Sequence, residues 1–220
     1  MKEATLDQAA KILALFKDTP SEQVQDLLES GFLADLRDGN IADVNRDEFR
    51  RLVGLEPLFA PREWQVWKTI TLGTHKDADA IRQALKANGC RISNYGNDIL
   101  GKPAFSVAHA ETELDLVTVS VAQLGFKKGA TRKDIYARAL QLGLELCPAE
   151  VGPQLRLQHK DQPRGEWLLI GMEPITDSGG DLDVFGVFHG DDGLWLDTFY
   201  GSPDYFWRSF GRWVFVLPRK

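Results

Sequence analysis

Cysteine is scarce in this sequence. Only Cys90 and Cys147 occur, and they form no Cys-x-x-Cys pair. A disulfide framework or a structural zinc site is therefore not expected. Long apolar runs are missing too, since the longest uncharged stretch is the 11 residues from Leu116 to Phe126, well short of the roughly 20 that a membrane-spanning helix needs. We expect a protein of a reducing compartment, the cytoplasm, without a membrane partner.

The signatures of several large enzyme classes are absent as well. The chain contains no GxxxxGK[ST], GxGxxG, HExxH or GxSxG pattern, which disfavours the commonest nucleotide-binding, metalloprotease and serine-hydrolase functions. No cofactor is predicted. The net charge of −6 is unevenly distributed: residues 1–61 carry −5, residues 62–164 carry +4, and residues 165–220 carry −5. Both ends would repel nucleic acid, so a nucleic-acid partner is disfavoured.

The first 60 residues have the pattern of short helices. Thr5 and Gln8 fit a capping box, and apolar residues follow at helical spacing. A second helix is predicted with Thr19 as cap and Pro20 in the first helical position, and a third from Asn45. Residues 55–61 contain two prolines and predict a connector.

The remaining residues mix helix and strand patterns. Helices are predicted over 77–88 and 131–143, and residues 84–101 also fit a helix–turn–helix pattern, with Ser93 capping a second helix over 94–100 that suits a DNA major groove poorly. Strands are predicted over 67–72, 114–121, 154–159, 166–173, 182–188, 193–199 and 213–217. We therefore predict an α+β protein, with a helical region 1–60 and an α+β domain 61–220. In that domain a mixed α/β stretch precedes a C-terminal antiparallel β-meander.

Cys147 is a candidate nucleophile. Such a role needs His159 or His189 as the base, with Glu150 or Asp161 orienting it. The competing interpretation is a small buried residue between Leu146 and Pro148, because free cysteine is often simply buried. No family-specific cysteine signature surrounds it, which favours burial.

Six aspartates and no glutamate lie between residues 177 and 197. Asp177, Asp181 and Asp183 are candidate ligands for calcium, which prefers hard oxygen donors. The spacing of an EF-hand is absent, and aspartate also forms tight turns by capping its own backbone. Turn chemistry is the favoured interpretation, and no metal is predicted.

The C-terminal segment is rich in aromatic residues: residues 195–215 hold nine of the 22 in the chain. On a strand, the adjacent Tyr205, Phe206 and Trp207 cannot all face one core, because neighbouring side chains point to opposite sides. One interpretation is an exposed binding surface, and the other is a sheet with aromatics packed on both faces. The candidate binding residues are Trp195, Tyr200, Tyr205 and Trp207.

A basic segment in the middle of the chain contains Lys127, Lys128, Arg132 and Lys133. It supports a weaker hypothesis of contact with nucleic acid. The leading hypothesis is a non-catalytic protein that binds a protein or small ligand through its aromatic C-terminal sheet. The alternative is a small hydrolase or transferase that uses Cys147.

Three segments resemble hypothetical proteins of bacteria, many from uncultured lineages, over roughly residues 64–220. The segments are GCRISNYGNDILGKPAF (89–105), LCPAEVGPQLRL (146–157) and MEPITDS (172–178). The resemblance implies a bacterial, cytoplasmic protein. It assigns no activity, and therefore no catalytic residues are carried over.

Overall fold

The computed structural model describes residues 5–39, 49–50, 52–55 and 63–219. The chain divides into two units, residues 1–60 and 61–220. The α+β class predicted from the sequence is confirmed, because helices accompany a large mixed sheet. No helix within these described ranges is long and apolar enough to cross a membrane.

The described part of the first unit contains α1 (Leu6–Ala14), α2 (Ser21–Glu29) and α3 (Phe32–Asp38). The predicted capping box of α1 is present: Thr5 N donates to Gln8 Oε1 at 2.9 Å and Gln8 N donates to Thr5 Oγ1 at 3.3 Å. Helix α2 begins one residue later than predicted, without a side-chain cap, so the predicted capping role of Thr19 is wrong. Helix α3 was not predicted, and the expected start of a helix at Asn45 lies outside the described residues.

The second unit contains α5 (Ala78–Ala87), α6 (Asn94–Leu100), α7 (Arg132–Gln141) and α8 (Val151–Gln158). The side chains of Asp77, Ser93 and Thr131 cap the first three of these helices, because each accepts a hydrogen bond from a backbone N–H three residues later. These three helices match the predicted ranges closely.

The strands of this unit are β1 (Lys68–Leu72), β2 (Arg91–Ile92), β3 (Thr112–Ser120), β4 (Ala130–Thr131), β5 (Trp167–Ile170), β6 (Ile175–Thr176), β7 (Leu182–Gly190), β8 (Gly193–Tyr200), β9 (Phe206–Trp207) and β10 (Arg212–Leu217). The main sheet has the order β1-β3-β10-β5-β7-β8-β2, with β6 beside β7, while β4 and β9 form a separate pair. Strands β5, β7 and β8 are antiparallel neighbours, as expected for the C-terminal part. The last strand, β10, lies between β3 and β5 and runs parallel to β5, so it leaves the meander.

The predicted strand at 154–159 is wrong, because residues 154–158 belong to helix α8, which His159 caps. The alternation of polar and apolar residues there suggested period 2. Every residue from Val151 to Arg156 is buried, so most of the helix has no solvent-facing side to give the sequence a helical period. Gly152 lets α8 approach β7 closely: a Cβ at this position would lie 2.5 Å from Cβ of Phe185.

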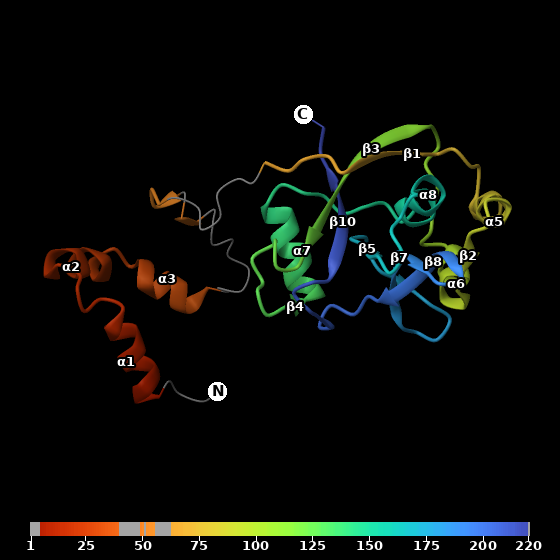
Figure 1. Cartoon of the computed structure of the whole chain (residues 1–220). Coiled ribbons are helices and arrows are strands. Elements are labelled where there is room, and N and C mark those ends of the chain that lie inside the picture. Colours follow the sequence, from red (N-terminus) through yellow and green to blue (C-terminus); the bar gives the residue numbers. More distant parts are fainter. Residues whose placement is uncertain (1–4, 40–48, 51, 56–62, 220) are drawn as a thin grey trace. The chain divides into compact units, whose positions relative to one another are not determined.

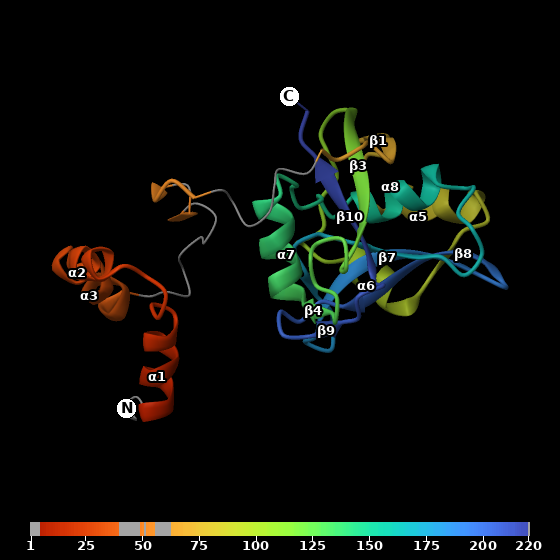
Figure 2. The same ribbon diagram turned by 60° about the vertical axis from the view of Figure 1, so that its left-hand side comes forward.

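Aromatic and aliphatic side chains form the core of this unit between the sheet and its helices. Tyr136 of α7 packs edge-on against Trp213 and Phe215 of β10, with ring centroids 5.5 and 5.9 Å away. Figures 1 and 2 show α7 at the end of the sheet near β4 and β10, whereas α5 and α6 lie at the other end near β2 and β8. The segment that joins β8 to β10 therefore returns across the sheet toward α7.

Candidate functional site

A pocket of about 670 Å³ lies where this returning segment passes β5 and β8. Its aromatic lining comes from three separate parts of the chain: Trp167 of β5, Phe199 of β8, and Tyr205, Phe206, Trp207 and Phe210 from β9 and its flanks. Its charged lining consists of Arg164, Glu166, Arg208 and Arg212. The volume falls within the range of about 300–1,000 Å³ that is typical of small-molecule sites.

Several of the pocket rings are unusually exposed. Tyr205 is 44% exposed, Phe206 55% and Phe210 73%. Trp207 is half-buried, and its ring stands edge-on against the fully buried Trp213 at a centroid distance of 5.3 Å. Trp207 therefore contacts both the core and the pocket, whereas the neighbouring Phe206 is exposed on the pocket side.

The rings form a continuous chain of aromatic contacts. Trp167 lies 5.1 Å from Phe199, Phe199 lies 6.3 Å from Trp207, and Trp207 lies 5.0 Å from Tyr205, all between ring centroids. Their interplanar angles of 64–66° are those of edge-to-face pairs, which are favourable. Such mutual packing holds the pocket walls in place without a ligand.

A glycine positions β9. Gly129 precedes β4 with φ of +107°, and a Cβ there would lie 2.4 Å from the carbonyl oxygen of Trp207 and 2.7 Å from the Phe206 ring. A side chain at this position would therefore be strained and would also collide with β9. The missing side chain allows the Phe206 ring to lie over the backbone of Gly129.

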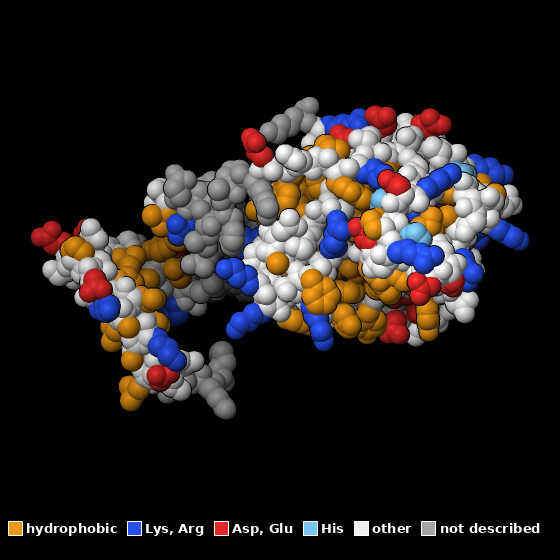
Figure 3. Space-filling view, viewed as in Figure 1, with side chains coloured by type: hydrophobic (Ala, Val, Ile, Leu, Met, Phe, Trp, Pro, Cys, Tyr) orange, Lys and Arg blue, Asp and Glu red, His pale blue; other side chains and the backbone are white. Residues whose placement is uncertain are grey.

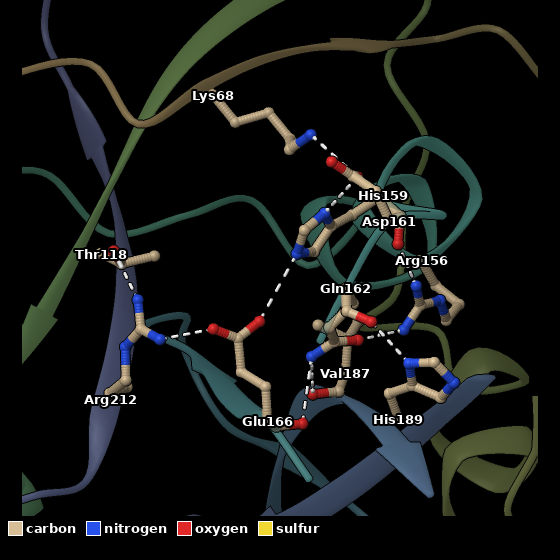
Figure 4. A network of polar contacts seen from close by, with 10 residues as sticks. All are labelled: Lys68, Thr118, Arg156, His159, Asp161, Gln162, Glu166, Val187, His189 and Arg212. Atoms are coloured by element: carbon tan, nitrogen blue, oxygen red, sulfur yellow. Dashed lines mark hydrogen bonds and ion pairs between the residues drawn. The ribbon is translucent and has the colours of Figure 1, made fainter. Parts of the chain in front are cut away.

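A polar network borders the aromatic lining (Figure 4). Arg212 donates to one carboxylate oxygen of Glu166 and, at 3.2 Å, to the hydroxyl of Thr118. The other oxygen of Glu166 lies 3.6 Å from Nε2 of His159. Neither of these two buried atoms has a hydrogen-bond partner among the described residues. On the far side of the imidazole, Nδ1 lies 3.0 Å from Asp161, whose pKa is lowered chiefly by this contact.

This network affects the charge available to a ligand. Glu166 neutralises the charge of Arg212. This arginine therefore mainly holds the side of the pocket in place. Arg164 lies at the edge of ion-pair range, 3.8 Å from a fully exposed Asp191, and such a surface contact is weak. Arg208 is exposed and has no ion pair with any described residue. The pocket therefore presents cationic groups beside its rings.

The four aromatic residues predicted from the sequence do not act together. Tyr205 and Trp207 line the pocket. Tyr200 contacts Tyr205 from outside it, with ring centroids 5.3 Å apart. Trp195 lies elsewhere on β8, where it stacks on Arg91 and donates to Asp192. Trp213 and Phe215, from the same aromatic-rich segment, are core residues with no exposure.

The structure does not bring the three candidate catalytic residues together. Cys147 is 4% exposed, burial raises its pKa, and its thiol donates to the carbonyl of Val214. Glu150 is 1% exposed and accepts from the backbone N–H groups of Gly73 and Ala108. His159 instead contacts Asp161 and Glu166. Within the described residues, no hydrogen bond or ion pair joins any two of Cys147, His159 and Glu150. This geometry does not favour a thiolate nucleophile.

One of the three candidate calcium ligands, Asp177, is engaged in forming a turn. Asp177 accepts hydrogen bonds from the backbone of Gly179 at 2.8 Å and of Asp181 at 2.9 Å, as an aspartate that caps its own turn does. Burial, together with nearby aspartates, raises the pKa of Asp183 to about 6. In the part of the chain that the structure describes, no three His, Cys, Asp or Glu side chains are placed to hold a metal ion.

Sequence patterns did not reveal Trp167, Glu166 or the arginines of the pocket. Trp167 and Glu166 lie about 40 residues before β9, and no local pattern links the two segments. Among these residues, only Arg208 and Arg212 lie within the aromatic-rich segment 195–215 that the sequence singles out. A scan against family models, a search of curated proteins and a search of solved structures each find no match. Functional inference therefore rests on the geometry of the pocket.

Proposed function

We propose that this is a binding protein whose ligand site is the aromatic pocket between β5, β8 and β9. The carrying observation is that six aromatic rings from three chain segments converge on one pocket of about 670 Å³, with four of them, Trp167 included, 44–73% exposed. Large rings left in water are unfavourable unless a ligand covers them, and exposed apolar patches commonly mark binding sites.

The lining favours a ligand with a flat apolar body and an anionic group. The rings offer faces and edges for a flat body, with roughly 0.5–1.5 kcal/mol per good aromatic contact beyond area burial. Arg208 and Arg164 offer hydrogen bonds and charge to an anion at the rim. Glu166 is engaged with Arg212 and therefore adds little repulsion.

Binding of 2-naphthalenesulfonate, a flat anionic probe, tests this function on the full chain. Saturation-transfer NMR and calorimetry should show binding to the native protein and at least a tenfold weaker affinity for the double variant Tyr205→Ala/Phe210→Ala. These side chains are 44% and 73% exposed, so their removal should leave the fold intact, which circular dichroism checks. Tyr95→Ala is the matched control, because Tyr95 is 62% exposed on α6 and outside the pocket. Equal affinity of the native protein and the folded double variant, or no binding to either, would reject the proposal.

A further inference from the structure

The small β4–β9 sheet joins two segments that are far apart in the sequence. Ala130 pairs with Trp207 and Thr131 with Phe206. Next to this pairing, the backbone N–H of Arg132 donates to the carbonyl of Tyr205 at 3.0 Å. The basic segment 127–133 is thereby fixed alongside the aromatic segment 203–212, which supplies most of the pocket rings.

The combined surface has a charge opposite to that of the whole chain. Segments 127–133 and 203–212 contain six Lys and Arg residues and one acidic residue, Asp204, whereas the protein carries a net charge of −6. Figure 3 shows Lys and Arg side chains beside hydrophobic side chains in the region of β4. Such a local reversal of sign indicates an anionic partner.

Four of these six cations are free to contact a partner. Arg132 lies over the ring of Tyr136 at 4.6 Å, and Arg212 is held by Glu166. The other four are exposed and form no ion pair with the described residues: Lys127, Lys128, Lys133 and Arg208. They lie on both sides of the β4–β9 pair, so together they border the exposed rings.

We propose that the ligand of the pocket is single-stranded nucleic acid. This inference rests on the proposed function and names the class of ligand. One unpaired base stacks on the exposed rings of Tyr205, Phe206 and Phe210. The flanking phosphates contact Arg208 on one side and the lysines of segment 127–133 on the other. Proteins that bind single strands combine aromatic stacking surfaces with cations that follow the backbone. A duplex keeps its bases stacked inside and cannot offer one to the pocket.

Other anionic partners fit the surface less well. An acidic peptide supplies charge but no flat ring for the pocket. An anionic bilayer presents a broad surface, whereas six rings here line a concavity. A proline-rich peptide would use the aromatics but leave four cations without a counter-charge. Only a strand of nucleotides alternates flat rings with negative charges.

Fluorescence anisotropy with labelled oligo(dT) and oligo(U) of 12 nucleotides, at 50 mM salt, tests the proposal on the full chain. Tyr205→Ala/Phe210→Ala should weaken binding about tenfold or more, because stacking on an aromatic side chain contributes about that factor per base. Lys127→Glu/Lys128→Glu should weaken binding. It should also make the fall of the logarithm of the association constant with the logarithm of the salt concentration less steep, by about 0.7 for each phosphate that the variant no longer neutralises. Lys86→Glu is the matched control, since Lys86 is exposed on α5, and it should leave the affinity unchanged.

The outcomes separate this inference from the proposed function. Binding of naphthalenesulfonate without binding of either oligonucleotide would overturn the inference and leave the proposed function standing; failure of both probes would overturn both. Oligonucleotide binding that is unaffected by Tyr205→Ala/Phe210→Ala would overturn the inference, because charge alone would explain it. Equal binding of a polyglutamate of matched charge, or of anionic phospholipid vesicles, would also overturn it. A preference between oligo(dT) and oligo(U) would support the inference and identify the type of strand.

Discussion

Replacing Asp183 by Asn should stabilise the protein at neutral pH. Asp183 of β7 is 7% exposed, and burial, with Asp177, Asp181 and Asp197 nearby, raises its pKa from 3.8 to about 6. In the folded state the charged carboxylate is thus disfavoured relative to the unfolded chain. A shift of about two pKa units corresponds to at most about 3 kcal/mol, since each unit is worth about 1.4 kcal/mol. Asn keeps the shape and still accepts a hydrogen bond from Thr198.

The sign of the effect fixes its pH dependence. Between pH 3.8 and about 6, the folded protein binds more protons at Asp183 than the unfolded chain does. The free energy of unfolding therefore falls in this range as the pH rises. The penalty is fully present above pH 6 and absent below pH 3.8. The gain from Asp183→Asn should therefore be about 2–3 kcal/mol at pH 7.5 and fall to near zero at pH 3.8 or below.

Urea unfolding of both proteins, followed by tryptophan fluorescence at pH 7.5 and pH 3.6, measures this difference. The comparison with the parent protein cancels the effects of other carboxylates, such as Asp161, whose pKa is lowered. Asp191→Asn is the control, because that side chain is fully exposed, and it should change little. A neutral or destabilising Asp183→Asn at pH 7.5, or an equal gain at both pH values, would refute the reasoning.

Two further substitutions and one labelling experiment test the packing of the core. Gly152→Ala should destabilise by about 1–3 kcal/mol in urea unfolding, because the added methyl group would meet Phe185 and the strain outweighs the better helix propensity. The thiol of Cys147 should react with a disulfide reagent only after unfolding, since it is 4% exposed and its pKa is raised; fast labelling of this residue in the native state would contradict its burial. Glu150→Gln should cost about 1–3 kcal/mol, measured by the same unfolding assay, because one of two backbone N–H groups loses its acceptor.

Elements with local signals could be predicted from the sequence. The capping side chains of Thr5, Asp77, Ser93 and Thr131 bond to backbone groups three residues away, so a short window contains both partners. The long strands β3, β7 and β8 could also be predicted, because their sequences alternate or are long enough to be recognised as strands. Helix α8 could not be recognised, because the burial of every residue from Val151 to Arg156 removes the periodicity that marks a helix in a sequence.

Only part of the candidate site could be predicted from the sequence. The adjacent aromatics of β9 indicated exposure, because a strand cannot bury neighbouring side chains in one core. In the structure Phe206 is exposed on the pocket side, whereas Trp207 is half-buried and contacts both the pocket and Trp213 of the core. The use of that surface for binding stays a prediction. Trp195 was grouped with these residues by sequence distance alone, although it lies outside the pocket.

The sequence by itself determined the α+β class, the capped helices and the presence of an aromatic segment and a basic segment, because these depend on residues close along the chain. Only the tertiary structure decided that β10 lies between β3 and β5, that Trp167 faces the rings around β9, and that β4 joins the basic segment to the aromatic one. These arrangements depend on long-range strand pairing and on which surfaces bury each other most favourably. A pair as short as β4–β9, with two residues in each strand, contains too few residues to leave a pattern in the sequence.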